Sequence, residues 1–176
     1  MGNVEIIKGD ITEMDVDCIV NAANTTLLGG GGVDGAIHRK AGPDLLEECK
    51  KLNGCKTGEA KITKGYRLKA KFVIHTVGPI YSGGKRGEDK LLYNAFYNSL
   101  KLAKEYNIKT IAFPAISTGA YGYPKDEAAK VAFKSILDFV NENGQVFEKI
   151  YMVLYDDTTF KIFKKIFDDN FKEGVL

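Results

Sequence analysis

Residues 21–38 read Asn-Ala-Ala-Asn-Thr-Thr-Leu-Leu-Gly-Gly-Gly-Gly-Val-Asp-Gly-Ala-Ile-His, and this stretch is the most informative part of the sequence. Four consecutive glycines separate an apolar strand from a helix. Glycine permits positive φ and close approach of a ligand, while the free N–H groups and positive dipole end of a helix start attract anions. The pattern therefore predicts an anion site. The glycines alone leave an alternative open, a flexible turn with Asp34 as the helix N-cap.

Strands and helices alternate on both sides of this stretch. Short apolar or alternating runs predict strands at 4–8, 17–21, 60–63, 71–77, 110–113 and 149–154. A 3.6-residue period predicts helices at 35–41, from 43 onward, at 88–106, from 124 to about 144, and at 158–170. This alternation is typical of a layered α/β domain with helices on both faces of a parallel or mixed sheet. No linker or repeat divides the chain, so residues 1–176 are expected to form a single domain.

Composition argues against several classes of protein. The chain has 176 residues, 44% of them hydrophobic, and its net charge of +2 is too small for a dedicated nucleic-acid or membrane surface. Its three cysteines form no pair of C-x-x-C motifs, so neither structural zinc nor a disulfide scaffold is expected. There is no signal peptide and no run of 18 apolar residues, and the expected location is the cytoplasm.

Unusual residues follow three of the predicted strands, where ligands bind in such sheets. Gly-Asp-Ile-Thr occupies 9–12, and Pro-Ala-Ile-Ser-Thr-Gly-Ala-Tyr-Gly-Tyr-Pro occupies 114–124. The second of these runs from small residues into a helix start, as 29–34 does, so the two loops together could hold a diphosphate from both sides. No G-x-G-x-x-G directly follows a strand and no G-x-x-x-x-G-K-[ST] occurs, which argues against an ordinary NAD dehydrogenase and a P-loop NTPase.

Four motifs occur one after another in the sequence, and together with their spacing they cover most of the chain. They are Val-Asn-Ala-Ala-Asn at 20–24, Gly-Gly-Gly-Gly-Val-Asp-Gly-Ala-Ile-His-Arg at 29–39, His-Thr-Val-Gly-Pro at 75–79, and Ser-Thr-Gly-Ala-Tyr-Gly-Tyr-Pro at 117–124. In type and spacing they resemble a macro domain of the MacroD type. The resemblance implies a three-layer α/β/α sandwich with a six-stranded mixed sheet that binds ADP-ribose. For this subgroup it also implies hydrolysis of ADP-ribose from modified side chains or deacetylation of O-acetyl-ADP-ribose. No cofactor is expected, and no metal is expected because the sequence offers a single carboxylate at Asp34 and no cluster of metal ligands.

The resemblance also implies where the nucleotide lies. Asp10 would accept a hydrogen bond from the adenine amino group beside the Ile11 backbone, and Tyr155 would stack on the ring. The diphosphate would be held mostly by backbone N–H groups of two loops, which comprise Gly31, Gly32 and Val33, and Ser117, Thr118, Gly119, Ala120, Tyr121 and Gly122. Tyr121 would cover the distal ribose or act as part of a closing lid.

Purely structural roles for these residues remain as alternatives. Asp10 can instead cap the turn at 11–14, and Tyr155 can pack under the last helix, with Phe160 a weaker candidate for the stacking role. The glycines of the second loop can serve turn geometry alone.

The same resemblance places the reactive corner at Asn21, Asn24 and Asp34. Asn24 would bind hydroxyls of the distal ribose, Asn21 would support the site, and Asp34 would orient or activate water near the anomeric carbon. An ordinary glycosidase needs two carboxylates, because a poor leaving group must be protonated as water attacks. One carboxylate suffices when the leaving group is itself a carboxylate, whose conjugate acid has a pKa of about 4. We therefore expect mono-ADP-ribose on Asp or Glu side chains to be the substrate.

Two histidines and two rival functions complete the sequence-based predictions. His38 lies one helical turn after Asp34 and is expected to support the glycine loop rather than to transfer a proton. His75, inside an apolar strand, is expected to be structural. A non-catalytic reader of ADP-ribosylated proteins and a phosphatase acting on ADP-ribose 1″-phosphate remain the alternatives. The expected partners are ADP-ribose, O-acetyl-ADP-ribose and mono-ADP-ribosylated proteins, and the expected oligomeric state is a monomer.

Overall fold

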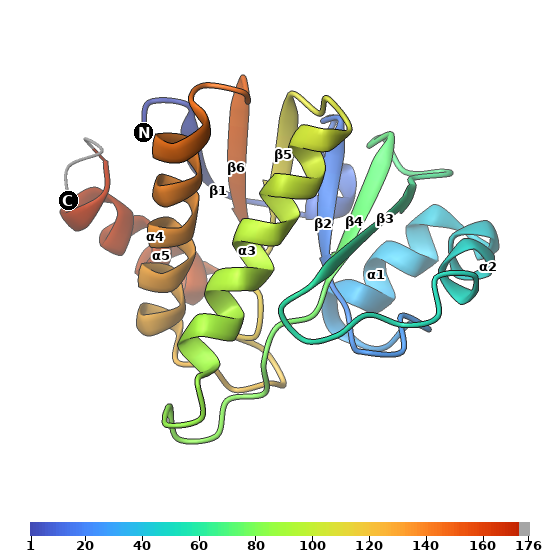
Figure 1. Cartoon of the computed structure of the whole chain (residues 1–176), viewed down its shortest axis with the longest axis horizontal. Helices are drawn as coiled ribbons and strands as arrows, with labels where there is room; N and C mark the ends of the chain where they lie inside the picture. The colour runs from blue at the N-terminus through green and yellow to red at the C-terminus, as the bar shows by residue number, and fades with distance from the viewer. Residues whose placement is uncertain (173–176) are drawn as a thin grey trace.

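Six strands form one mixed sheet in the computed structural model, which describes residues 1–172. Their order across the sheet is β1-β6-β5-β2-β4-β3 (Figure 1). The strands are β1 (Val4–Lys8), β2 (Cys18–Ala22), β3 (Ala60–Lys64), β4 (Phe72–Thr76), β5 (Thr110–Phe113) and β6 (Lys149–Leu154). The first five in spatial order pair in parallel, and β3 pairs antiparallel with β4 at the edge. The carboxyl ends of five strands therefore meet at one edge of the sheet.

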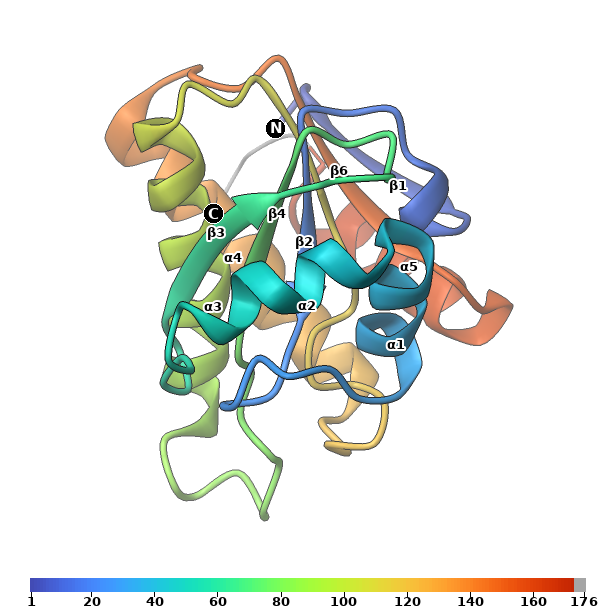
Figure 2. The same cartoon turned by 90° about the vertical axis from the view of Figure 1, so that its right-hand side faces the viewer.

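Helices cover both faces of this sheet. The first face carries α3 (Glu88–Glu105), α4 (Lys125–Asn143) and α5 (Asp157–Asn170). The opposite face carries α1 (Gly32–Ala41) and α2 (Pro43–Lys50), which lie in front of the sheet in Figure 2. A short 3-10 helix, η1 (Ile11–Glu13), follows β1. The α/β sandwich and the six-stranded mixed sheet predicted from the sequence are confirmed.

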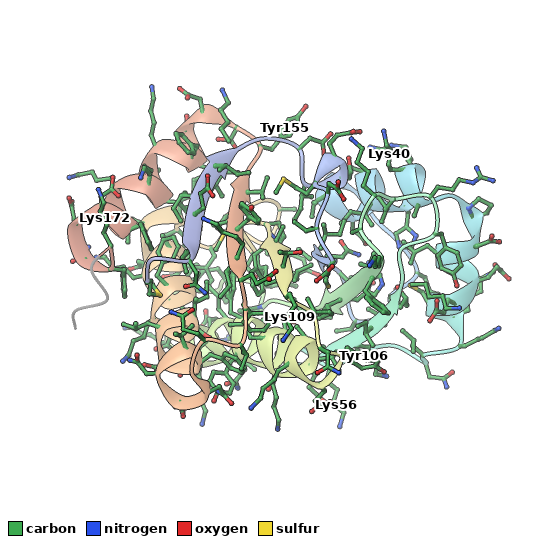
Figure 3. The ribbon with its side chains drawn as sticks, turned by 90° about the horizontal axis from the view of Figure 1, so that it is seen from above. Lys40, Lys56, Tyr106, Lys109, Tyr155 and Lys172 are labelled. Carbon is green, nitrogen blue, oxygen red and sulfur yellow. The ribbon has the colours of Figure 1, made fainter. Side chains whose placement is uncertain are left out.

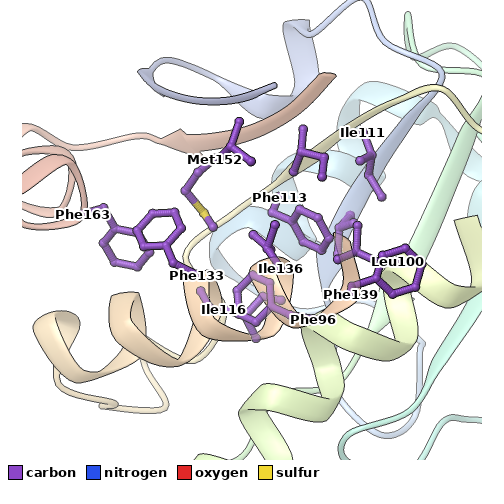
Figure 4. Packing of buried hydrophobic residues seen from close by; sticks show 14 of the residues in the cluster. Phe96, Leu100, Ile111, Phe113, Ile116, Phe133, Ile136, Phe139, Met152 and Phe163 are labelled. Atoms are coloured by element: carbon purple, nitrogen blue, oxygen red, sulfur yellow. The ribbon is translucent and has the colours of Figure 1, made fainter. Parts of the chain in front are cut away.

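Two hydrophobic clusters, one on each face, hold the layers together. Alternate residues of the central strands supply them: Cys18 and Val20 face α3 and α4, whereas Ile19 faces α1 and α2. The first cluster is rich in aromatic rings, and Figure 4 shows Phe113 of β5 among side chains of α3 and α4. Because the central strands are buried on both faces, they are mostly apolar, as is typical of parallel strands between helical layers. The buried polar residues Asn21, His75 and Thr76 lie near the carboxyl ends of β2 and β4.

The ends of the observed strands agree with the predicted ones to within one residue, and the largest difference at a helix start is in α1. The helix predicted at 35–41 begins at Gly32, although Gly32 has a positive φ of 56°, because the first backbone hydrogen bond of the helix runs from the N–H of Gly35 to the carbonyl of Gly31 at 3.2 Å. Pro124 is the N-cap of α4 rather than its first residue. Within the described residues, no helix combines the length and apolar character needed to cross a membrane.

Candidate functional site

The predicted site residues gather along the edge where the parallel strands end. The loops that follow β2, β4 and β5 come together at the lower edge of the sheet in Figures 1 and 2. A hydrogen bond from the backbone N–H of Ala23 to the carbonyl of Thr76, 2.9 Å, joins the ends of β2 and β4. The equivalent bond from Gly9 to Leu154, also 2.9 Å, joins the ends of β1 and β6.

Asp34 is the buried carboxylate of this edge, with 4% of its surface exposed. It lies in the first turn of α1, whose N-cap is Gly31 with no side-chain cap, so the alternative in which Asp34 is the helix N-cap is wrong. Its Oδ1 accepts a hydrogen bond from Nδ2 of Asn21 at 2.8 Å and lies 3.4 Å from Nε2 of His38. These contacts fix one oxygen and leave Oδ2 to face the loop.

Gly30 marks the place toward which Oδ2 points. A Cβ atom added there would lie 3.1 Å from Asp34 Oδ2 and 3.5 Å from Asn24 Nδ2. The carboxylate oxygen and the amide nitrogen thus converge on space that only a glycine leaves open. An acceptor beside a donor is the arrangement needed to orient a water or a hydroxyl group.

Asn24 also shapes its own loop. Its Nδ2 donates to the carbonyl of Gly29 at 2.9 Å, and its Oδ1 accepts from the backbone N–H of Thr26 at 3.0 Å. A primary amide carries two N–H donors, so one remains for a ligand while the oxygen is committed to the loop. His38 lies against the same loop, since a Cβ at Gly29 would be 3.9 Å from its Cδ2. This contact agrees with the supporting role predicted for His38.

Gly31, Gly32 and Val33 form the uncapped start of α1. The first N–H groups of a helix have no intrahelical acceptor and lie at its positive dipole end. They therefore present donors toward the edge of the sheet where the phosphates were predicted.

The loop from Ser117 to Gly122 presents its backbone to the same edge. Its hydroxyl groups turn toward protein acceptors: Ser117 Oγ donates to the Pro79 carbonyl at 2.8 Å, and Thr118 Oγ1 donates to the Ala115 carbonyl at 2.8 Å. Ser117 adopts a positive φ of 68°, an uncommon conformation for a residue other than glycine. Gly119 and Ala120 are exposed at the tip. The loop then enters α4, a second helix without a side-chain cap.

Tyr121 is half-buried, and its carbonyl accepts a hydrogen bond from the backbone N–H of Tyr81 at 2.8 Å. The loop after β4 therefore supports the predicted phosphate loop. The loop after β4 is itself held by Glu88, which is buried and accepts hydrogen bonds from the backbone N–H groups of Ser82 at 2.7 Å and Arg86 at 2.7 Å. These bonds lower the pKa of Glu88 to about 2. Sequence reasoning missed this clamp.

Asp10 and Tyr155 stand at the neighbouring ends of β1 and β6. Asp10 Oδ1 caps η1 by accepting from the backbone N–H of Thr12 at 2.9 Å, so the capping role is present and uses one carboxylate oxygen. Ile11 beside it is buried in the core. Tyr155 is 81% exposed at the rim of the molecule (Figure 3), whereas Phe160 packs against the first cluster. Packing of Tyr155 under the last helix is therefore wrong.

His75 is the residue whose surroundings the sequence least revealed. It is fully buried in β4 opposite Asn21 of β2, and its Nδ1 lies 3.2 Å from Asn21 Nδ2. Burial, with the charge of His38, lowers the pKa of His75 to about 3. Only the pairing of β2 with β4 brings these side chains together, and no local motif encodes that register.

The described residues also form a cavity that lies away from the predicted site. A cavity of about 640 Å³ lies between α3, α4 and the end of α5, and none of the predicted site residues lines it. Within residues 1–172, no three His, Cys, Asp or Glu side chains group closely enough to hold a metal ion.

Known proteins resemble this chain over almost its full length. The family model of the macro domain matches residues 20–132. A macro domain-containing protein of Methanosarcina mazei is 60% identical over 162 residues, which cover 92% of this chain and 86% of the relative. Human ADP-ribose glycohydrolase MACROD2 is 53% identical over 169 residues, 96% of this chain but 40% of that longer protein. A mutant Oceanobacillus iheyensis macrodomain with ADPR superposes with a TM-score of 0.91 at 42% identity, covering 96% of this chain and 94% of the other. The chain therefore belongs to the macro domain family, among relatives of the MacroD type.

Proposed function

We propose that this chain binds ADP-ribose across the carboxyl ends of β1, β6, β5 and β2. Three strand spacings separate β1 from β2, roughly 14 Å, a span suited to an extended nucleotide. In this arrangement Asp10 and Tyr155 face the adenine, the uncapped starts of α1 and α4 face the diphosphate, and Asn24 with Asp34 faces the distal ribose. Relatives named as an ADP-ribose glycohydrolase and as a macrodomain with ADPR support the proposal.

The proposed reaction is hydrolysis of mono-ADP-ribose from Asp or Glu side chains of modified proteins. Water attacks the anomeric carbon, the bond from that carbon to the acyl oxygen breaks, and the carboxylate leaves with the electron pair. The proton that the water loses passes to the solvent. Asp34 orients the water and stabilises positive charge at the sugar, and it needs no acid partner because the leaving group is a weak base. The same site is proposed to hydrolyse the acetyl ester of O-acetyl-ADP-ribose.

One observation carries the proposal of an enzyme rather than a reader. Asp34 Oδ2 and Asn24 Nδ2 converge beside Gly30, where a side chain would intrude. Burying a charge is costly, and the two protein partners of Asp34, Asn21 and His38, contact Oδ1 and leave Oδ2 facing the proposed position of the ribose. A binding module has no need of a buried carboxylate oxygen aimed at the sugar.

Two measurements on four proteins test this function. The wild type, Asn24→Ala and Asp34→Ala are compared with Glu47→Ala, which removes an exposed carboxylate from α2. We expect all four to bind ADP-ribose by calorimetry. We expect the wild type and Glu47→Ala to release ADP-ribose from an automodified transferase in EDTA, and the other two to be slower by about 10²-fold or more. Binding by all four with release by none would show a reader instead.

A further inference from the structure

A network of buried polar side chains lies beneath Asp34. Asn21 and His75 are fully buried, and Thr63 of β3 is 2% exposed. Asn21 Nδ2 contacts both Asp34 Oδ1 at 2.8 Å and His75 Nδ1 at 3.2 Å, and His75 Nε2 lies 2.9 Å from Thr63 Oγ1. This network thus links three neighbouring strands, β2, β4 and β3, to the first turn of α1.

Only one arrangement of protons satisfies these contacts. A carboxylate accepts but does not donate, so the amide nitrogen of Asn21 must face Asp34. Its second N–H then points to Nδ1 of His75, which must be unprotonated to accept it. The imidazole proton accordingly resides on Nε2 and is donated to Thr63 Oγ1, whose own proton goes to the Lys64 carbonyl at 3.1 Å.

The groups around His75 keep the ring neutral. Its low pKa follows first from burial and then from His38. Cys49 Sγ lies 3.7 Å from Nε2, and burial raises the pKa of this thiol to about 11, so the pair does not ionise near neutral pH. A neutral ring that accepts at Nδ1 is the form that the amide of Asn21 requires.

The amide of Asn21 is held by its nitrogen alone. Its Oδ1 is buried and has no hydrogen-bond partner within residues 1–172. If the amide turned over, the oxygen would face the Asp34 carboxylate and the lone pair of His75 Nδ1, and both contacts would be repulsive. The two acceptors therefore fix its orientation, and removal of His75 would leave Asp34 as the sole restraint.

We propose that His75 is a positioning residue for the hydrolysis, which fixes the Asn21 amide so that Asn21 holds Asp34 Oδ1 and leaves Oδ2 facing the sugar. His75 itself touches no substrate in this scheme. The proposal rests on the proposed function, and it assigns a role in turnover to a strand residue whose sequence context suggested only packing.

Two substitutions of His75 separate this role from packing. In His75→Asn the side-chain amide ends at the place of Nδ1 and can accept from Asn21. In His75→Gln it reaches the place of Nε2, keeps the Thr63 contact and is closer to histidine in volume, but offers nothing at Nδ1. We expect His75→Asn to retain turnover within about threefold and His75→Gln to lose about 10- to 100-fold in kcat, with ADP-ribose affinity similar in both. A purely structural role predicts the opposite ranking, which would overturn the proposal, as would equal activities.

A second measurement does not depend on either variant folding. Long-range ¹H–¹⁵N spectra of the wild type report which ring nitrogen of His75 carries the proton. We expect the neutral form with the proton on Nε2 from pH 5 to 8, with and without ADP-ribose. A proton on Nδ1 would overturn the proposal. A wild type that binds ADP-ribose but releases none from protein would instead overturn the proposed function, and it would leave the hydrogen-bond directions to be judged by the spectra.

Discussion

Gly78→Ala offers a direct test of how the proposed phosphate loop, residues 117–122, is supported. Gly78 lies just beyond β4, where the backbone passes close to the start of the loop that follows β5. A Cβ atom at this position would lie 2.5 Å from Ile116 Cγ2 and closer still to Ser117 Oγ. An ordinary contact begins at 3.4 Å, so these two side chains, or the loop that carries them, must shift by about 1 Å.

Both stability and turnover should respond to that displacement. Overpacking of this kind costs about 1–3 kcal/mol, which at about 2–4 °C per kcal/mol for a chain of this size lowers Tm by roughly 2–12 °C. A shift of about 1 Å in groups that position a substrate can lower turnover by about 10²-fold. The Ser117–Pro79 hydrogen bond is strained by the same movement.

Gly65→Ala is the matched control. A Cβ there would meet the Ala70 carbonyl at an even shorter distance, but Gly65 joins β3 to β4 at the opposite edge of the sheet. Calorimetric Tm and single-turnover release of ADP-ribose are measured for both variants. We expect both to be destabilised and only Gly78→Ala to lose turnover in its folded fraction. Wild-type turnover in Gly78→Ala, or an equal loss in Gly65→Ala, would refute the assignment of the loop.

Three further substitutions test the proposed adenine wall formed by Asp10 and Tyr155, the hydrogen bonds from the loop after β4 to Glu88, and the hydrophobic core. Tyr155→Ala should weaken ADP-ribose binding by the loss of one stacked base, about 1–3 kcal/mol, and leave Tm unchanged because the ring is exposed; unaltered affinity by calorimetry would remove Tyr155 from the site. Glu88 has a folded pKa of about 2, below its ordinary value of 4.5, so its stabilising effect is complete above pH 4.5 and is lost as pH falls toward 2. Wild-type Tm should thus fall more steeply than that of Glu88→Gln between pH 5 and 2, and parallel curves would contradict the clamp. Phe133→Ala should cost about 3–5 kcal/mol in urea unfolding, since the ring is fully buried against three other phenylalanines, and a cost below about 1 kcal/mol would be inconsistent with that packing.

The sequence predicted strands and motifs better than it predicted contacts between strands. The runs at 4–8, 110–113 and 149–154 match β1, β5 and β6 residue for residue. Burial on both faces gives β5 and β6 nearly continuous apolar character, whereas β1, the first strand in the spatial order, alternates between buried and more exposed residues. The start of α1 was missed by three residues, since glycine carries little helical signal.

Within the site, residues close in sequence were anticipated and residues brought together by the sheet were not. Asn24 and Asp34 belong to one loop and helix, and their convergence at Gly30 agrees with the predicted reactive corner. The contact of Asn21 with His75 depends on the register of β2 and β4, and the Glu88 clamp depends on how a turn folds back on a helix start. Neither arrangement has a periodic or compositional signature.

Pairing of β1 with β6 has a consequence for synthesis on the ribosome. Asn3, just before β1, bonds to Phe147, just before β6, across a separation of 144 residues. At about 5–20 residues per second, β1 waits roughly 7 to 30 s for the translation of β6, the one strand that pairs with it among the described residues. The reactive corner on β2 can therefore assemble while the adenine wall does not yet exist. A nascent chain at that stage would contain the groups proposed for hydrolysis without the residues proposed to hold the adenine, so under the proposed function the site would be complete only with the last strand.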